Sequence, residues 1–441
     1  MSSGLTGRVR ELPSHAAAHF GIKRVGEVRR TPWHVLQGNG GFRTYFFGSV
    51  VSDFGTWLQN TAQVVIAYQL AHSVLTVGLV TFAQFTSPLL LGPWAGVLAD
   101  KFGGRRTLLG TQIPSAVVAA TLAGLDFGGV LNTSWLVAGA VVGGLAFTFA
   151  LPARNVTVQR LVPADKLKSA YAMDTVSYNL GRALAPVLTI GIGIAGGNFA
   201  WAFAANALSF VVFSLILWRA HLDQAMEPER RSRVRDGFVI ARRDTCIMIL
   251  LLMVAAVTIA DDPILVLGPA LARQLHASPY WSGWFIAALG TGTVLGSFRR
   301  SKHQPTIRLA ATALGTLAMC MLIFVFAPSM WIAISAALGA GASCLVANSV
   351  TRAILAERAG PERAAAVMAV WAIAWAGSKP LASLFDGLLG SLIGPQWTGL
   401  ILATPALIPL LVIELAPGLG RWLVNPRRGR PRSLATIGAR G

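Results

Sequence analysis

Ionisable side chains stand inside several long apolar stretches of this sequence. Two adjacent carboxylates, Asp261 and Asp262, interrupt the run LLMVAAVTIADDPILVLGPALA. A charge at the centre of a bilayer costs roughly 2.5–3.5 kcal/mol on insertion scales, so such residues usually pair or line a pathway. The same pattern holds for five further residues: Asp53, Asp174, Arg182, Lys379 and Asp386. These residue types predict either fixed ion pairs or carboxylates that bind and release protons.

No histidine falls within these apolar stretches. Carboxylates would therefore carry any proton transfer, and the sequence offers no ligand set for a buried metal. No nucleotide-binding loop of the G-x-x-x-x-G-K-S/T type occurs, so an ion gradient rather than ATP would supply energy. We expect no cofactor and no metal.

The apolar stretches have the length of membrane spans, which need about 20 residues. The chain is 54% hydrophobic and only 12% charged, with a mean hydropathy of +0.59, whereas ordinary globular proteins are roughly 25% charged. We therefore predict an all-α membrane protein with twelve transmembrane helices, at approximately 44–70, 75–99, 107–125, 134–152, 167–195, 199–218, 246–271, 281–298, 308–327, 330–352, 364–393 and 397–416.

The basic residues predict the orientation of these spans. Of the 37 lysines and arginines, 34 fall in the tails and in alternate connections, Arg273 is the one in the other connections, and Arg182 and Lys379 lie within spans. Positive charge marks cytoplasmic segments, so both termini are expected in the cytoplasm and the protein in the cell (plasma or inner) membrane. The net charge of +19 then reflects topology, and no nucleic acid is expected as a partner.

The longest connection divides the predicted spans into two pseudo-symmetric six-helix bundles. The segment ARNVTVQRL, from residue 153, resembles ANSVTRAIL, from residue 347, and each follows the fourth span of its half. Parallel repeats of this kind are typical of rocking transporters. The predicted units are a basic tail 1–43, a bundle 44–218, a cytoplasmic loop 219–245, a bundle 246–416 and a basic tail 417–441.

A short motif lies between the second and third spans, GVLADKFGGRR, residues 96–106. Glycines permit a tight turn and close helix approach, and a carboxylate beside arginines suits a charge-assisted latch. The motif resembles the loop G-x-x-x-D-R-x-G-R-R of the major facilitator superfamily, although Lys101 and Gly104 stand where that pattern has arginines. The resemblance implies that a cytoplasmic gate is locked in the outward-open state by Gly96, Asp100, Gly103, Arg105 and Arg106.

Two further stretches narrow the resemblance. GRALAPVLTIG in the fifth span partly matches an antiporter pattern, with Gly181 and Pro186 in place. FGTWLQNTAQVVIAYQL in the first span is similar to the superfamily branch that contains siderophore exporters such as the enterobactin exporter. The likeness covers most of the first half of the chain and is looser in the second.

The resemblance also implies which charges can meet. In the superfamily, spans 1 and 5 share one bundle and spans 7 and 11 the other, so we expect Asp53 or Asp174 to pair with Arg182. By the same argument Asp261 or Asp262 would pair with Lys379, and only this second pairing has matched depths at 1.5 Å per residue. Whether the pairs are fixed or titrate is open. Asp53 is the first candidate for titration because span 1 lines the superfamily cavity.

Other polar and aromatic residues are candidates for the gate and the cavity. Arg154 and Arg352, at matching repeat positions, are either inner-gate residues or plain topogenic charge. Trp371 and Trp375 are four residues apart and share a helix face. This spacing favours simple helix packing, and stacking on an aromatic substrate is the second interpretation. The possible substrate cavity comprises Gln59, Gln63, Tyr68, Asn348, Trp371 and Trp375.

These observations predict a secondary active transporter, a proton-coupled exporter of a siderophore, secondary metabolite or drug that works by alternating access. Its partners would be a small-molecule substrate, protons and the lipid bilayer, and we expect a monomer. An importer or uniporter of the same fold remains an alternative. A membrane-embedded enzyme or a non-transporting sensor is a further alternative, disfavoured because no nucleophile constellation appears.

Overall fold

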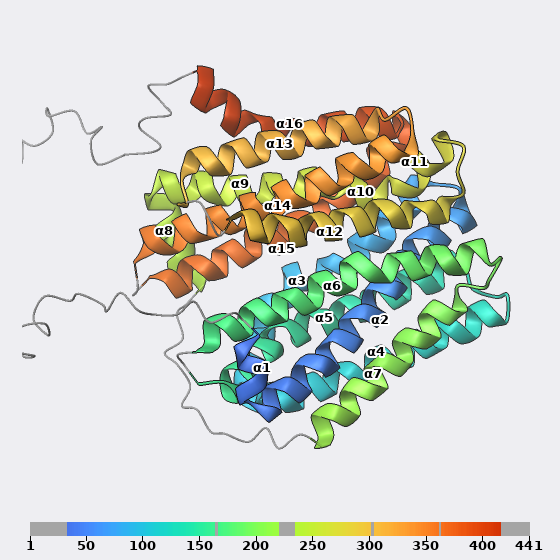
Figure 1. The fold of residues 1–441 in the computed structure, drawn as a ribbon, viewed down its shortest axis with the longest axis horizontal. Coiled ribbons are helices and arrows are strands. Elements are labelled where there is room, and N and C mark those ends of the chain that lie inside the picture. The colour runs from blue at the N-terminus through green and yellow to red at the C-terminus, as the bar shows by residue number, and fades with distance from the viewer. Residues whose placement is uncertain (1–32, 164–165, 220–233, 301–303, 361–362, 416–441) are drawn as a thin grey trace, which may run out of the picture.

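The computed structural model describes residues 33–163, 166–219, 234–300, 304–360 and 363–415. Within these ranges nearly every residue is helical and none lies in a strand. Figure 1 shows long helices that run side by side along the longest axis of the molecule. Most of the predicted tails and of the predicted 219–245 loop lies outside the described residues.

The first half of the chain forms helices over each predicted range. The first long helix, α2, begins inside the predicted basic tail 1–43. Asn39 caps this helix by accepting a hydrogen bond from the amide of Phe42. The bounds are α1 (His34–Gly38), α2 (Gly40–Ala71), α3 (Val74–Phe102), α4 (Gly104–Phe127), α5 (Thr133–Leu161), α6 (Leu167–Ile194) and α7 (Ala200–Arg219).

The second half follows the same scheme, with one predicted span divided into pieces. Its elements are α8 (Val234–Arg243), α9 (Thr245–Asp261), α10 (Pro263–Val266), α11 (Gly268–Gln274), η2 (Pro279–Ser282), α12 (Gly283–Arg300), α13 (Ile307–Val325), α14 (Met330–Ala359), α15 (Ala364–Leu392) and α16 (Pro395–Leu415). The division falls at Asp262, where Pro263 lacks the N–H that would continue the hydrogen-bond ladder of α9.

Length and composition make nine of the described helices able to cross a membrane. The helices α2, α6 and α12 are not among the nine. Two of these, α2 and α6, carry Asp53, Asp174 and Arg182, so their sequence is less apolar than that of their neighbours. The count of twelve spans therefore stays a prediction.

Helices from the first half pack mainly on one another, as do helices from the second half. Contacts between the halves are concentrated on two helix pairs, α3 with α15 and α6 with α12. Glycine brings the backbones close in both pairs. A side chain on Gly78 would meet the backbone of Ser383 and Gly387, and one on Gly290 would meet the backbone of Arg182. Small residues allow such approach between membrane helices.

All of these glycine contacts lie toward one end of the molecule. We call it the α11 end, and the opposite one, where α1 and α8 lie, the α8 end (Figure 1). The seam continues at the α11 end, where Tyr280 of η2 packs on Gly193 of α6. The two halves are therefore closed against each other there.

The buried apolar side chains fall into two clusters. One includes the second half and those parts of α2, α3, α4 and α5 that lie toward the α11 end. The other, which includes Phe42, Tyr45, Leu108 and Phe213, belongs to the first half at the α8 end. The core is continuous between the halves at the α11 end and separate at the α8 end.

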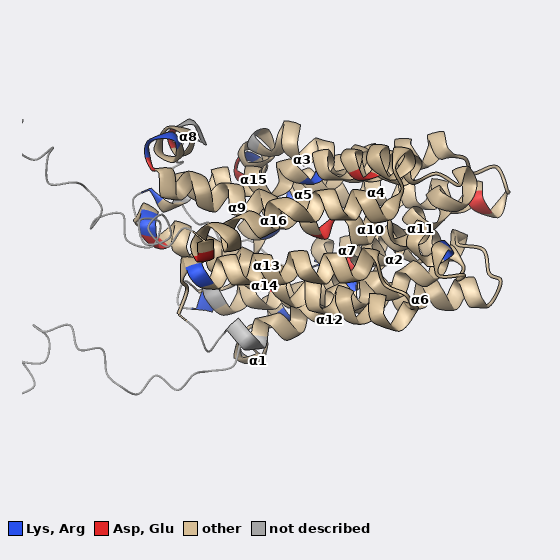
Figure 2. Cartoon of the chain, turned by 90° about the horizontal axis from the view of Figure 1, so that it is seen from above, with Lys and Arg blue, Asp and Glu red and all other residues tan. Residues whose placement is uncertain are grey.

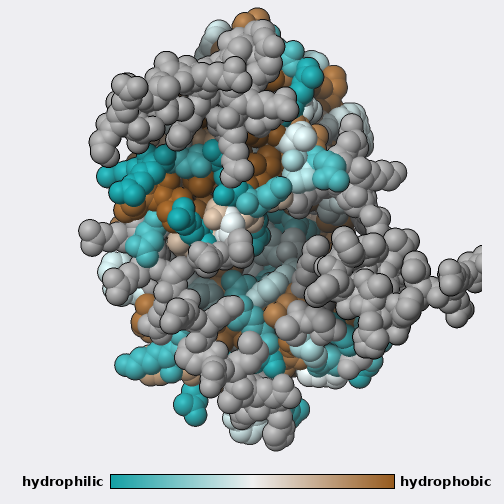
Figure 3. Space-filling view, turned by 90° about the vertical axis from the view of Figure 1, so that its left-hand side faces the viewer, coloured by the Kyte–Doolittle hydropathy of each residue, from teal (hydrophilic) through white to brown (hydrophobic). Residues whose placement is uncertain are grey.

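The α8 end carries most of the charge and is hollowed. Figure 2 shows lysine and arginine positions gathered there, with few at the α11 end. Figure 3 looks onto the α8 end and shows hydrophilic residues in a recess between an upper and a lower group of residues. Together with the divided core, this describes a molecule open at the α8 end.

Candidate functional site

Arg154 of α5 is the centre of the first buried charge cluster. Its Nη1 and Nη2 lie 2.6 and 2.9 Å from the two carboxylate oxygens of Asp53 on α2. Nη2 also lies 2.9 Å from Oδ1 of Asp174 on α6. Three helices are thus tied by one guanidinium, and the two-pronged contact to Asp53 is the stronger kind of charge-assisted hydrogen bond.

Hydroxyl groups complete this cluster. Ser177 donates to Oδ2 of Asp53 at 2.6 Å, and its oxygen lies 3.3 Å from that of Ser49. The phenol of Tyr45 donates to Oδ1 of Asp174 at 3.5 Å. Asp53 is buried, whereas the Asp174 side chain is 22% exposed. The cluster holds two carboxylates and one cation, so its charges do not balance when both acids are ionised.

The second cluster lies where α9 breaks. Lys379 Nζ of α15 lies 2.5 Å from Oδ1 of Asp262, and Ser383 donates to Oδ2 at 2.5 Å. Lys379 also lies over the ring of Phe85 on α3, 5.1 Å from its centroid. Asp262 is fully buried and holds two partners on α15.

Asp261 faces a different partner from the first half of the chain. Its Oδ2 lies 3.7 Å from Nη2 of Arg182 on α6 and 3.7 Å from Sγ of Cys344 on α14. Arg182 also lies over Trp57, 5.3 Å from the ring centroid. The adjacent aspartates therefore point to different elements, Asp261 to α6 and α14 and Asp262 to α15.

One expected pairing is present and the other is wrong. Lys379 pairs with Asp262, one of the two acids named for it. Arg182 pairs with neither Asp53 nor Asp174, because those acids lie closer to the α8 end and are held by Arg154. Arg154 was expected at the inner gate, beyond a span ending at residue 152. It lies inside α5 because the helix continues through Pro152 to Leu161.

Asp386, which was expected to lie within a span but had no expected partner, also belongs to the second cluster. It stands seven residues after Lys379 and three after Ser383, on the same face of α15. It is fully buried, and neither carboxylate oxygen has a hydrogen-bond partner among the described residues. Spacing alone could have placed it on this face, but its burial required coordinates.

Aromatic side chains line α15 toward the α8 end. The rings of Trp371 and Trp375 are stacked, 6.3 Å apart and 3° from parallel. The guanidinium of Arg352 lies over Trp371, 4.9 Å from its centroid. Nε1 of Trp371 and Oδ1 of Asn348 are buried without a hydrogen-bond partner in the described part of the chain. This group, Arg352, Trp371, Trp375 and Asn348, could hold a flat or anionic molecule.

The polar residues of α2 do not share one cavity, contrary to expectation. Gln63 is buried and donates to the carbonyl of Leu136 at 3.0 Å, so its amide joins α2 to α5. Gln59 accepts from Asn206 of α7 at 2.8 Å. Both amides are engaged in helix packing because they face neighbouring helices of the first half.

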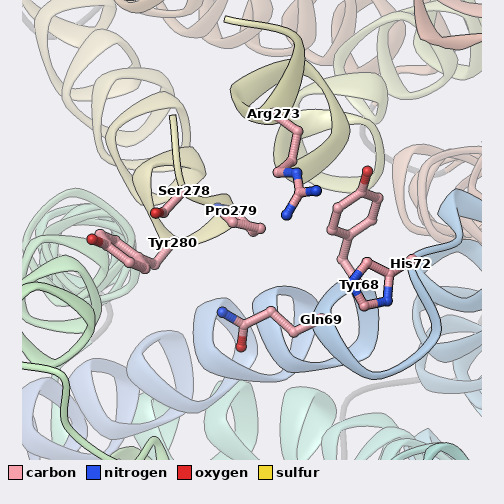
Figure 4. A pocket seen from close by; sticks show the side chains of 7 residues that line it. All are labelled: Tyr68, Gln69, His72, Arg273, Ser278, Pro279 and Tyr280. Carbon is pink, nitrogen blue, oxygen red and sulfur yellow. The ribbon is translucent and has the colours of Figure 1, made fainter. Parts of the chain in front are cut away.

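Tyr68 lies in a separate pocket of about 310 Å³ at the α11 end. Figure 4 shows Tyr68 and His72 at the end of α2 facing Arg273 of α11 across the pocket. Tyr280 of η2 lines the opposite side. The pocket lies where the two halves close, so Tyr68 belongs to that closure and not to the recess at the α8 end.

The GVLADKFGGRR motif forms the turn between α3 and α4 at the α8 end. Gly103 adopts φ +83°, which favours glycine, and Gly104 packs against the backbone of α5. Arg105 donates through Nε to the carbonyl of Leu217 at 2.7 Å and through Nη2 to that of Trp218. It thereby caps the carbonyl end of α7, where a cation is favoured.

One expectation for this motif differs from the structure. Gly96 was expected to allow close helix approach, but a side chain there would meet nothing within 4 Å. Arg106 is exposed, and Arg105 bonds within the first half and not across to the second. The latch that the resemblance implies concerns the outward-open state, so it stays a prediction in this conformation, which is open at the α8 end.

The long apolar helices, the buried charges between them and the closed seam define a polytopic membrane transporter. The sequence family described as transmembrane secretion effector, a member of the major facilitator superfamily, matches residues 31–420. The chain belongs to this family, and the resemblance seen in the loop motif is confirmed.

Two curated relatives and one solved structure illustrate the similarity. The chain is 24% identical over 291 residues to YfiS, an MFS-type transporter of Bacillus subtilis (strain 168), across 63% of this chain and 67% of the relative. It is 27% identical over 193 residues to the staphyloferrin A transporter of Staphylococcus aureus (strain NCTC 8325 / PS 47), across 43% of this chain. That match spans only 48% of the relative's length.

A mutant of the peptide transporter POT in complex with alafosfalin shares the fold. The TM-score is 0.70 at 16% identity, and the match covers 89% of this chain and 99% of that structure. At this identity the likeness concerns the fold alone. Family and relatives are transporters, so the coarse expectation of a multi-pass membrane transporter is confirmed.

Proposed function

We propose that the protein is a proton-coupled exporter of a small organic molecule that works by alternating access. Its helices α2–α7 and α9–α16 would form two six-helix bundles that rock about the buried charges. The seam closed at the α11 end and the recess at the α8 end suit one extreme of such a cycle. We also propose that the protein has twelve transmembrane spans and is a monomer.

The α8 end would face the cytoplasm. Lysine and arginine gather at that end, and positive charge favours the inner side of a bacterial membrane. Both termini would then be cytoplasmic, and the recess would receive substrate from inside the cell. An exporter would load its substrate from this recess.

The observation that carries proton coupling is the unequal charge of the Arg154 cluster. Asp53 and Asp174 share one guanidinium, so one proton balances the cluster. Asp174 is partly exposed, which gives water a route to the cluster. Proton uptake by one carboxylate would weaken its hold on Arg154 and loosen the junction of α2, α5 and α6.

The substrate class follows from the group on α14 and α15. Stacked Trp371 and Trp375 offer a flat apolar surface, and Arg352 lies beside it. An aromatic or anionic molecule would use both features. A siderophore fits this description, and one of the relatives is named for staphyloferrin A.

Reconstituted vesicles with an imposed pH gradient test the proposal. Candidate siderophores and anionic aromatic dyes should be driven against their gradient when protons flow the other way. Asp53→Asn should abolish gradient-driven transport without lowering the amount of folded protein. Glu414→Gln, which changes an exposed acid on α16, is the matched control. Transport that is unchanged in Asp53→Asn, or that is driven only inward, would overturn coupling at Asp53 or export respectively.

A further inference from the structure

Asp386 is an ionisable group that the proposed mechanism does not yet use. The residue is fully buried in α15, no donor group of the described residues bonds to either of its oxygens, and the polar side chain that it meets is the carboxylate of Asp262. Burying a carboxylate without a hydrogen bond or a paired cation is far costlier than burying the neutral acid. The position therefore favours a carboxyl group that carries its own proton.

The charges around Asp386 lead to the same result independently. The cluster contains three acids, Asp261, Asp262 and Asp386, and two cations, Arg182 and Lys379. Each cation already has a carboxylate of its own, Arg182 that of Asp261 and Lys379 that of Asp262. The third acid is left without a cation, and one proton makes the cluster neutral.

Among the described residues, the other helices packed on α15 carry their charges away from Asp386: those of α8, and Arg352, Glu357 and Arg358 of α14, lie toward the α8 end. The charged groups that act on it are Asp262 and Asp261 of α9 and Lys379 of its own helix. On α3 the ionisable residues are Asp100 and Lys101, in the last turn at the α8 end, and on α16 the one such residue is Glu414. The proton on Asp386 therefore has the Asp262 carboxylate as its natural acceptor.

We propose that Asp386 is a proton-binding site that exchanges its proton with the Asp262–Lys379 pair. When Asp386 holds the proton, Lys379 forms an ion pair with Asp262 alone. When the proton passes from Asp386 to Asp262, Asp386 becomes the ionised carboxylate, and Lys379 is drawn toward it along its own helix face. This deepens the proposed function and rests on it, because it supplies a second proton site in the other half of the protein.

The seam between the halves controls access to this site. Gly387, the next residue along α15, packs directly on Gly78 of α3. In this conformation the contact seals Asp386 from the α11 side. Parting of α3 from α15 at that end would expose the carboxyl group to water on the α11 side, where it could gain its proton.

Infrared spectroscopy of the purified full-length protein in lipid nanodiscs tests the site without a substrate. A buried protonated carboxyl group gives a C=O stretching band well separated from the amide bands. We expect wild type to show this absorption at neutral pH and Asp386→Asn to lose part of it, because the proton shared by Asp53 and Asp174 would contribute a band of its own that remains. Glu414→Gln should retain it, since that acid is exposed. Persistence of the band unchanged in Asp386→Asn would overturn the proposal.

A second variant keeps the test decisive if Asp386→Asn does not fold. Asp386→Glu should keep a protonated carboxyl band at a shifted frequency, and an unshifted band would overturn the assignment. The readout is distinguishable from that of the proposed function. If the band belongs to Asp386 but vesicles show no proton-driven transport, then the proton site stands and the coupling fails.

Discussion

Arg182 and Asp261 form an ion pair between the two halves of the chain. Nη2 of Arg182 lies 3.7 Å from Oδ2 of Asp261, beyond a good hydrogen bond. Arg154, by contrast, holds Asp53 with two contacts of 2.6 and 2.9 Å. The pair between the halves is thus loose, and the cluster within the first half is tight.

We predict that Arg182 and Asp261 are coupled in transport. Arg182→Gln and Asp261→Asn should each slow transport, and the double variant should be less impaired than the two losses multiplied. Coupling of neighbouring residues is typically about 0.5–3 kcal/mol, or roughly 2- to 150-fold. A double-mutant cycle on initial transport rates measures it. Strictly multiplicative losses would show that the pair has no functional coupling.

Arg154 should matter more than Arg182 for stability. Arg154→Met leaves Asp53 and Asp174 without their cation, and removal of one partner from a buried pair costs about 3–5 kcal/mol. Arg182→Met should cost less, because its ion pair is long and its remaining contact is with the face of Trp57. Unfolding of each purified variant in detergent gives the comparison. Equal losses would contradict the ranking.

Much of the fold could be predicted because lipid leaves few options. Every backbone polar group in a bilayer must be satisfied internally, so an apolar stretch of sufficient length is a helix. Helix ends were less predictable. The helices of the spans expected to end at residues 152 and 352 continue to Leu161 and Ala359, because a hydropathy profile marks where the apolar sequence stops and not where the helix stops.

The charge pairs show which information was missing. Depth along the helices already placed Arg182 level with Asp261, but the assumption of pairing within each half favoured Asp53 or Asp174. The ion pair between Arg182 of α6 and Asp261 of α9 depends on how the two halves pack against each other, and residue spacing within one helix does not predict such packing. The burial of Asp386 was equally out of reach, since it depends on α3 and α9 together.

Two glycines of the loop motif should respond in opposite directions to the same change. Gly104→Ala places a methyl group against Ala153 and Thr157 of α5, and such overpacking costs about 1–3 kcal/mol. Gly96→Ala meets open space, and alanine is favoured over glycine in a helix by up to about 1 kcal/mol. Thermal unfolding temperatures of the two variants should therefore move apart. A drop for Gly96→Ala equal to that for Gly104→Ala would refute this account.

Arg105 and Arg106 provide a matched pair of adjacent arginines. Arg105→Ala removes the cap on the carbonyls of Leu217 and Trp218, and hydrogen bonds to a charged group contribute about 1.5–3 kcal/mol. Arg106→Ala removes an exposed side chain and should change stability by about 0.5 kcal/mol or less. Amide hydrogen exchange in the last turn of α7 should rise in the first variant only. Equal exchange in both would exclude the cap.

The meeting of Gly78 with Gly387 has a consequence for speed. Each glycine meets the backbone of the other helix and no side chain lies between them, so parting α3 from α15 requires no rotamer change at this point. A contact made by backbone atoms alone can separate and form again with a low free-energy barrier. The pace of the conformational cycle would then be set by the charged residues that must exchange partners, and not by the surface along which the halves separate.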